Sequence, residues 1–168
     1  LIEASKASTG ALAVHLEECE VGVLLTQAAG EFEEKLKAQE LTLLLKKPET
    51  EFVIRADGRH LWRVFDNLLN NIYKYAQPQT RVYLNMEQKG EFVEIVFRNT
   101  SRYELNLTGE ELRERFVRGD SSRSTEGNGL GLSIAQSLTE LMGGTFELVI
   151  DGDLFKVILA FPLVKTLF

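Results

Sequence analysis

Apolar residues recur at two spacings along the chain, and the spacing separates helices from strands. Helical spacing predicts helices over residues 21–40, over the segment that follows Asp57 and ends near Pro78, and over residues 130–142. Asp57 is a residue type that favours the N-cap of a helix, and a pair of glycines favours the end of the third helix. The expected core positions of the first two helices are Val23, Leu24, Ala28, Phe32 and Leu36, and Leu61, Val64, Phe65, Leu68, Ile72 and Tyr75.

Short runs that alternate, or that are wholly apolar, predict the strands. We expect strands over residues 11–20, 41–47, 52–56, 145–150 and 154–162, and a hairpin over residues 80–100. This hairpin turns at Lys89 and Gly90, and a second one turns at Asp151 and Gly152. Val82, Leu84 and Met86 are expected opposite Phe92, Val93, Ile95 and Phe97. The mixture predicts an α+β fold, a two-layer α/β sandwich with a mixed sheet packed on helices, rather than a doubly wound parallel sheet.

A long polar region separates the first hairpin from the last helix. Residues 99–128 contain five arginines and little apolar mass apart from one short helical turn, ELRERF. A stretch of this kind inside a compact domain is more often a functional lid than plain structure. Residues 118–127 are rich in Ser, Arg and Asp, so we expect a mobile lid there.

Composition and charge narrow the function classes. The chain has 168 residues, of which 44% are hydrophobic and 26% charged, and this fits one globular domain. Its net charge of −6 offers no positive field for nucleic acid. A single cysteine, Cys19, excludes an internal disulfide and favours a reducing, cytoplasmic compartment. The sequence has no apolar run of about 20 residues and no signal-peptide pattern, which predicts a soluble protein.

Residues 127–134, GNGLGLSI, place three glycines where the last helix begins. The unpaired N–H groups and partial positive charge of a helix N-terminus attract anions, and glycines let a phosphate approach that backbone. Gly127, Gly129 and Gly131 are therefore candidates for a phosphate cradle. A glycine-rich hinge without a ligand is the alternative, and the spacing matches neither the Rossmann nor the P-loop pattern.

The helix that follows Asp57 carries a polar stripe beside its apolar stripe. At about 100° per residue, Asn67, Asn71 and Lys74 fall on one side of the helix. Asparagine is a poor helix former, so two of them one turn apart point to a function. Amide oxygens suit Mg²⁺ when substrate phosphates supply the other ligands, and lysine suits a phosphate. A solvated polar face is the alternative, but the stripe and the glycines together favour a nucleotide site.

These segments resemble, in order, three boxes of a known family. NLLNNIYKYA is similar to the N box, and RFVRGDSSR followed by GNGLGLSIAQSLTELMGG is similar to the F and G2 boxes, of the ATP-binding catalytic domain of sensor histidine kinases. That domain belongs to the gyrase, heat-shock chaperone, histidine kinase and mismatch-repair ATPase superfamily. The resemblance covers residues 13–163 and implies a Bergerat-type ATP-binding fold. It also implies a histidine protein kinase that uses ATP and Mg²⁺ and transfers the γ-phosphoryl group to a histidine.

The resemblance implies roles for individual residues. Contacts with the nucleotide are implied for Asn67, Asn71, Lys74, Tyr75, Asn99, Phe116, Arg118, Gly127, Gly129, Leu130 and Gly131. Asn71 would be the Mg²⁺ ligand, and Lys74 and Arg118 would be the catalytic contacts with the phosphates. Phe116 would anchor the lid.

The chain departs from the family pattern at Asn99. The family has an aspartate there, which accepts a hydrogen bond from the adenine amino group, and spaced glycines follow. Here the segment is FRNTSRYEL, with Ser101 and Tyr103 where glycines are expected. An amide oxygen still accepts a hydrogen bond, but it is uncharged and its NH₂ group also donates. We therefore expect weaker selection of adenine over guanine.

The resemblance implies parts beyond the catalytic domain. Residues 1–12 resemble the end of a dimerisation and phosphotransfer helix, which leaves residues 13–168 as the catalytic domain. The acceptor histidine would lie upstream, since His15 and His60 belong to no phosphoacceptor motif. The implied partners are ATP, the dimerisation and phosphotransfer domain of the same protein and a response regulator receiver domain, and family members are homodimers often attached to the membrane. A nucleotide-sensing pseudokinase and a serine kinase of the anti-sigma-factor type stay open as alternatives.

Overall fold

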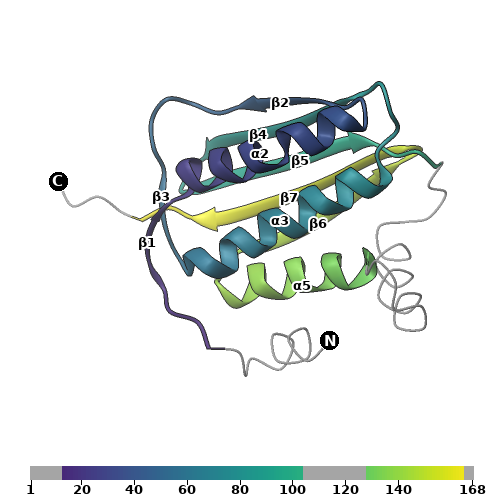
Figure 1. The fold of residues 1–168 in the computed structure, drawn as a ribbon. Helices are drawn as coiled ribbons and strands as arrows, with labels where there is room; N and C mark the ends of the chain where they lie inside the picture. The colour runs from purple at the N-terminus through teal and green to yellow at the C-terminus, as the bar shows by residue number, and fades with distance from the viewer. Residues whose placement is uncertain (1–12, 104–127, 165–168) are drawn as a thin grey trace.

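In the described part of the chain, three helices lie over one face of a five-stranded sheet, which makes a two-layer sandwich (Figure 1). A computed structural model of the chain describes residues 13–103 and 128–164. The elements in chain order are β1 (Glu17–Glu20), α2 (Val21–Ala38), β2 (Thr42–Lys46), β3 (Val53–Ala56), α3 (Gly58–Tyr75), β4 (Arg81–Lys89), β5 (Phe92–Thr100), α5 (Asn128–Leu141), β6 (Thr145–Asp151) and β7 (Leu154–Pro162). The α+β sandwich expected from the sequence is confirmed.

The main sheet is mixed, with the strand order β2-β4-β5-β7-β6. β2 and β4 are parallel, and every other neighbouring pair in this sheet is antiparallel. The two predicted hairpins form the β4–β5 and β6–β7 pairs. β1 and β3 make a separate two-stranded antiparallel sheet at the side of the molecule (Figure 1).

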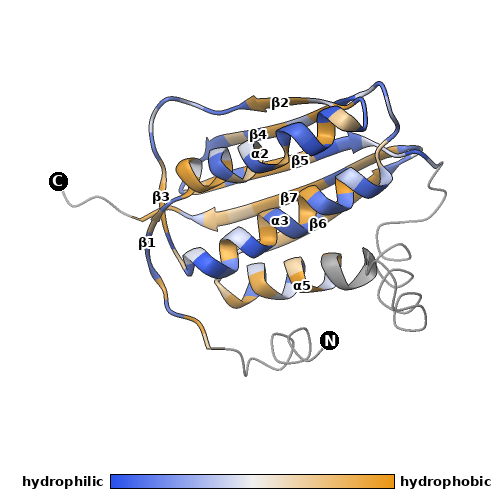
Figure 2. Cartoon of the chain, viewed as in Figure 1, coloured by the Kyte–Doolittle hydropathy of each residue, from blue (hydrophilic) through white to orange (hydrophobic). Residues whose placement is uncertain are grey.

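The core lies between the helices and the sheet. Alternate residues of β4, β5 and β7 are buried there and form one hydrophobic core with the apolar residues of α2, α3 and α5. In α3, Phe65 is fully buried, and its ring centroid lies 5.9 Å from that of Phe97 on β5. β2 and β7 are largely orange in Figure 2, while α2 and α3 alternate between orange and blue, as amphipathic helices on one face of a sheet should.

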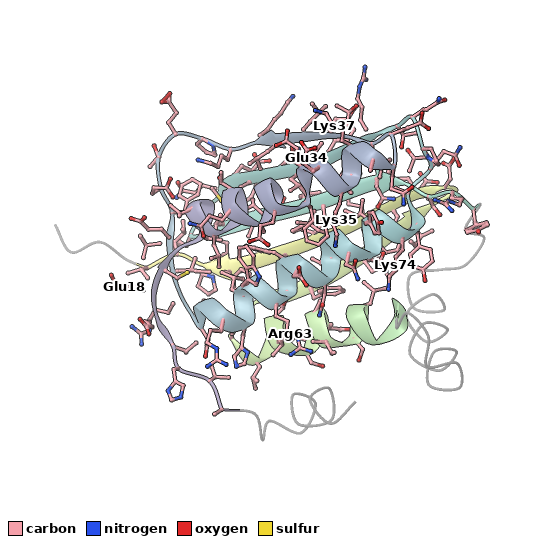
Figure 3. The ribbon with its side chains drawn as sticks, in the orientation of Figure 1. Glu18, Glu34, Lys35, Lys37, Arg63 and Lys74 are labelled. Carbon is pink, nitrogen blue, oxygen red and sulfur yellow. The ribbon has the colours of Figure 1, made fainter. Side chains whose placement is uncertain are left out.

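A cation also bridges the first two helices. The Lys35 Nζ atom of α2 lies 5.0 Å from the ring centroid of Phe32 and 5.4 Å from that of Tyr73 on α3. Figure 3 shows Lys35 between the two helices. Such cation–π contacts add to the apolar packing of α2 on α3.

Two expected core positions, Val23 and Tyr75, and one expected cross-strand position, Phe92, differ from the prediction. Val23 is 40% exposed, and the buried stripe of α2 instead includes Val21 and Leu25. Phe92 is 44% exposed, because the period of two along β5 turns Val93, Ile95 and Phe97 toward the helices. Tyr75 is only half-buried at the last position of α3.

Two glycines end α5 and allow the chain to turn back into β6. Gly143 has a φ of +88°, a backbone conformation that favours glycine, and its N–H donates to the Glu140 carbonyl oxygen at 3.0 Å. A Cβ atom on Gly144 would lie 2.6 Å from the Phe161 ring on β7. The second glycine therefore permits a close approach between the end of α5 and the sheet.

Candidate functional site

The start of α3 is fixed by Asp57. One carboxylate oxygen, Oδ1, accepts from the backbone N–H groups of Arg59 at 3.1 Å and His60 at 3.4 Å, which confirms the predicted N-cap. The other oxygen, Oδ2, accepts from the N–H of His15 at 2.9 Å. Burial opposes ionisation of Asp57, but these backbone hydrogen bonds, together with the charge of His60, hold the pKa of this carboxyl below its usual value.

His60 connects the same helix turn to the preceding segment. Its Nε2 atom lies 3.0 Å from the carbonyl oxygen of Ala13 and 3.7 Å from Oδ2 of Asp57. His15 contributes its backbone N–H to Asp57 while its side chain is exposed. Both histidines therefore have structural or surface positions, as the sequence predicts.

The polar stripe of α3 contains two buried amide groups that lack partners. Asn71 is 8% exposed and Asn67 is half-buried. Among the described residues, neither the Nδ2 atom of Asn67 nor that of Asn71 has a hydrogen-bond partner. A buried donor left unpaired costs about 1–3 kcal/mol, so native proteins retain such groups where a ligand, an ion or water satisfies them.

Two basic residues continue this stripe at either end. Lys74 lies near the C-terminal end of α3, on the side toward α5 in the view of Figure 3, and Arg63 lies nearer the start of the helix. Arg63 precedes Asn67 by one helical turn, so the spacing that singles out the two asparagines also includes it. The sequence reasoning missed Arg63, although the helical period could have found it.

Asn99 supplies a third unpaired amide atom from the end of β5. The residue is 4% exposed, and its Oδ1 atom is buried with no hydrogen-bond partner among the described residues. Asn99 belongs to the same face of β5 as the buried Phe97, which is the face covered by the helices. An unpaired acceptor thus accompanies the two unpaired donors of α3.

Backbone hydrogen bonds hold the end of α3 against the end of β5. The N–H of Gln77 donates to the Thr100 carbonyl oxygen at 2.8 Å, and the N–H of Arg102 donates to the Tyr75 carbonyl oxygen at 2.8 Å. Ser101 donates its N–H to the Asp153 carbonyl oxygen at 2.7 Å, which adds the β6–β7 turn to the same junction. These bonds bring the C-terminal part of the asparagine stripe and Asn99 to one end of the molecule.

A cavity of about 420 Å³ opens at this junction. It is lined by Gln77, Ser101, Arg102, Tyr103, Gly152 and Asp153. None of the predicted site residues lines it, and Tyr103, which is 62% exposed, forms part of its wall. The cavity residues come from three separate segments, so no local pattern could have assembled them.

The last helix starts two residues earlier than predicted. α5 begins at Asn128, so Gly129 lies inside the first turn, together with Leu130 and Gly131, rather than before the helix. The first four N–H groups of a helix have no intrahelical acceptor, and residues in that turn therefore still offer donors to an anion. Three other predicted site residues, Phe116, Arg118 and Gly127, lie outside the described residues, as does the predicted lid over residues 118–127.

The arrangement fits a polar, anionic ligand better than a metal ion held by the protein alone. Unpaired amide donors, a basic residue and the start of α5 all suit phosphate oxygens. Within residues 13–103 and 128–164, no group of three His, Cys, Asp or Glu side chains could hold a metal ion.

The family to which the chain is similar indicates the class of ligand. Residues 56–164 match the family described as histidine kinase-, DNA gyrase B-, and HSP90-like ATPase. The chain belongs to this ATPase family. The match starts at the last residue of β3 and includes α3, the main hairpins and α5, so it contains every candidate site residue that the sequence singled out.

Two proteins similar to this chain are sensor proteins by name. The probable sensor protein PcoS of Escherichia coli is 38% identical over 113 residues, which are 65% of this chain and 24% of PcoS. The sensor protein VanS of Enterococcus faecium is 31% identical over 123 residues, which are 72% of this chain and 32% of VanS. The chain thus spans about a quarter to a third of these relatives.

Solved structures confirm the fold. The nucleotide-free catalytic domain of histidine kinase ThkA superposes with a TM-score of 0.74 at 21% identity, covering 88% of this chain and 95% of ThkA. Full-length ShkA in complex with AMPPNP gives a TM-score of 0.80 at 20% identity, covering 98% of this chain and 35% of ShkA. In the described part of the chain, no helix has both the length and the apolar character needed to cross a membrane.

Proposed function

We propose that the chain is the ATP-binding catalytic domain of a sensor histidine kinase, and that it transfers the γ-phosphoryl group of ATP to a histidine of the same full-length protein. The observation that carries the proposal is the set of three buried amide atoms, on Asn67, Asn71 and Asn99, that find no hydrogen-bond partner in the described part of the chain and lie within the segment that matches the ATPase family. Sensor histidine kinases among its relatives support this reaction.

Transfer of a phosphoryl group needs little covalent chemistry from the protein, because positioning and charge neutralisation supply most of the catalysis. The stripe of α3 is suited to that task. Asn67 and Lys74 would meet the phosphates, and the N–H groups of the first turn of α5, from Gly129 to Gly131, would donate hydrogen bonds to the remaining phosphate oxygens. Arg118 would contact the γ-phosphate, and Phe116 would anchor the lid.

Mg²⁺ is proposed to bind through Asn71 and the phosphates. An amide oxygen is a hard, neutral ligand that Mg²⁺ accepts alongside phosphate oxygens and water. Asn71 is buried on the ligand side of α3, and no acidic cluster within the described ranges competes for the ion. The bound ion would neutralise charge on the β- and γ-phosphates.

Asn99 and Tyr75 are proposed to receive the base. The unpaired Oδ1 atom of Asn99 can accept a hydrogen bond from an exocyclic amino group, as of adenine. The backbone of Tyr75 is tied to Arg102, which keeps the end of α3 next to the end of β5.

The full-length protein would add the acceptor histidine and the partners. Residues 1–12 are proposed to end a dimerisation and phosphotransfer helix, and residues 13–168 to form the catalytic domain. A response regulator receiver domain would take the phosphoryl group from that histidine. The full-length protein would be a homodimer attached to the membrane, and this domain would act on the cytoplasmic side of that membrane.

Calorimetry with a non-hydrolysable ATP analogue tests the site. Binding to the 168-residue chain should depend on Mg²⁺, and Asn71→Ala should weaken it by about tenfold or more, since hydrogen bonds to charged groups contribute about 1.5–3 kcal/mol. Gln27→Ala is the control, because it removes a side-chain amide from an exposed position of α2, away from the stripe. Equal affinity for the wild type and Asn71→Ala, or absence of binding in both, would contradict the proposal.

Asn99 favours one further candidate, a nucleotide-sensing pseudokinase. A neutral amide in place of a carboxylate could reduce adenine selection without abolishing occupancy of the site. A longer protein that includes the acceptor histidine separates the two functions, because only a kinase forms acid-labile phosphohistidine from ATP.

A further inference from the structure

The face of the main sheet that points away from the helices carries an ordered charge pattern. α2, α3 and α5 all lie on the other face, and no described element covers this one (Figure 1). We call it the open face. Its central residues come from the middle strands β4, β5 and β7, where every second side chain points away from the core.

The strand registers place the open-face residues in rows that run across the sheet. In one row, Tyr83, Arg98 and Lys156 are direct neighbours. In the next row, two residues along each strand, Asn85, Val96 and Ile158 are neighbours, and in the row after that Glu87, Glu94 and Ala160 are neighbours. On these three middle strands, a basic row and an acidic row therefore lie on either side of an uncharged row, which Lys46 of β2 and Glu147 of β6 continue at the edges of the sheet.

Each outer row contains two like charges that are directly opposed. Arg98 faces Lys156 on the neighbouring strand, and Glu87 faces Glu94. Directly opposed like charges destabilise an antiparallel pair. The Arg98 guanidinium stacks 4.4 Å from the Tyr83 ring centroid, which orders the cation but adds no counter-charge. The Lys89 Nζ atom lies 3.9 Å from Glu87 Oε1 with both side chains more than half exposed, and such a pair contributes little.

The middle row also has features of an interface rather than of a free surface. Val96 and Ile158 are half-buried on a face that no described helix covers. The Oδ1 atom of Asn85 is buried and has no hydrogen-bond partner within the described residues. Contiguous apolar surface flanked by charged residues marks interaction sites on soluble proteins.

We propose that the open face is a self-association surface that binds the open face of a second copy of this chain. A two-fold axis along the Asn85–Val96–Ile158 row leaves the apolar rows in contact and turns the basic row of each copy onto the acidic row of the other. Arg98 of one copy then faces Glu94 of the second, and Glu94 faces Arg98. Two sheets stacked with aligned strands, about 10 Å apart, are a common packing of β-structure.

The charge pattern selects this occupant over an unrelated protein. Two like-charge pairs of opposite sign, on one face and equally far from a central row, are self-complementary under a two-fold axis. A partner of one charge sign would satisfy one outer row and repel the other. The same complementarity predicts dependence on ionic strength, because the Debye length falls from about 10 Å at 0.1 M to about 3 Å at 1 M.

Sedimentation velocity on the 168-residue chain tests the proposal. We expect a dimer that forms as protein concentration rises at low salt and dissociates at high salt. Glu94→Arg and Arg98→Glu should each weaken it at least about tenfold, because each replaces two attractive contacts by two repulsive ones. Glu33→Arg, the same charge change at an exposed position of α2, should leave the dimer intact. Circular dichroism and thermal melts establish that each variant folds.

Mixing the two single variants provides the decisive result. In a mixed pair, the Glu94→Arg copy is positive at both exchanged positions and the Arg98→Glu copy is negative at both. Both contacts between residue 94 of one copy and residue 98 of the other are then attractive. A 1:1 heterodimer should therefore form from two variants that are separately monomeric. A wild-type chain that stays monomeric at low salt and high concentration would overturn the proposal and assign the face to another partner. Variants that dimerise as well as the wild type, or that fail to associate when mixed, would overturn it too.

Discussion

Removing the Asp57 carboxylate is expected to destabilise the folded chain by about 2–3 kcal/mol. Loss of an N-cap costs about 0.5–2 kcal/mol, and loss of a hydrogen bond to a charged group costs about 1.5–3 kcal/mol. Asp57→Ala removes both, because one oxygen caps α3 and the other accepts from the His15 N–H. Water should recover part of the loss at this partly exposed end of the helix. The sum of the N-cap and hydrogen-bond contributions is therefore an upper bound on the destabilisation.

The loss should depend on pH, with a sign fixed by the hydrogen bonds. The folded pKa of Asp57 lies below the unfolded value, so its contribution is fully present above the unfolded pKa of about 3.9 and disappears as pH falls through the folded pKa. The difference in free energy of unfolding between the wild type and Asp57→Ala should therefore be larger above this unfolded pKa and shrink in acid.

Urea denaturation at several pH values measures this difference. Asp57→Asn should lose less stability than Asp57→Ala near neutral pH, because an amide oxygen still caps the helix, and the pH dependence of its own stability should carry no contribution from residue 57. Asp66→Ala, the same substitution on the same helix, should change stability by less than about 0.5 kcal/mol. Two results would contradict this role of Asp57. One is an equal loss of unfolding free energy in Asp57→Ala and Asp66→Ala, and the other is a loss in Asp57→Ala that does not change in acid.

Three further substitutions examine the core, a close backbone contact and the proposed base site. Phe65→Ala should cost about 3–5 kcal/mol in urea denaturation, because the ring is fully buried against the sheet, and a loss under about 1 kcal/mol would contradict that packing. Gly144→Ala should cost about 1–3 kcal/mol through overlap with the Phe161 ring, whereas Gly30→Ala, with open space around it, should stabilise α2 by about 0.5–1 kcal/mol. Asn99→Asp should raise the preference for ATP over GTP by about tenfold in competition binding, since a carboxylate accepts from adenine but repels the guanine carbonyl; an unchanged ratio would remove Asn99 from base recognition.

Local patterns predicted most of the fold because its elements have strong local signals. α3 combines an N-cap at Asp57 with an apolar stripe of period 3.6, and both hairpins have a glycine in the turn with a φ near +65°. The errors arise where two registers are equally apolar. Val23 and Phe92 each adjoin residues that are as hydrophobic as they are, so only contact with the sheet or the helices decides which side chain is buried.

The candidate site likewise has a part that one local pattern predicts and a part that depends on contacts between distant segments. Asn67 and Asn71 could be identified from one helix, because a single period relates them. Pairing of the parallel strands β2 and β4, and the hydrogen bond from Ser101 to the β6–β7 turn, join segments that are distant in the sequence. The cavity at this junction therefore could not be read from any single stretch, and neither could the juxtaposition of Asn99 with the end of α3.

The two ends of α3 explain how the chain can keep unpaired polar groups in a buried position. A hydrogen bond to Asp57 holds the first turn against residues 13–15. A backbone hydrogen bond joins Tyr75 to Arg102, which follows β5. A helix held at both ends cannot rotate its asparagine stripe into solvent, so the cost of the unpaired Nδ2 atoms remains in the folded state. Because a ligand that satisfies these atoms removes that cost, nucleotide binding and folding stability are coupled through the same side chains.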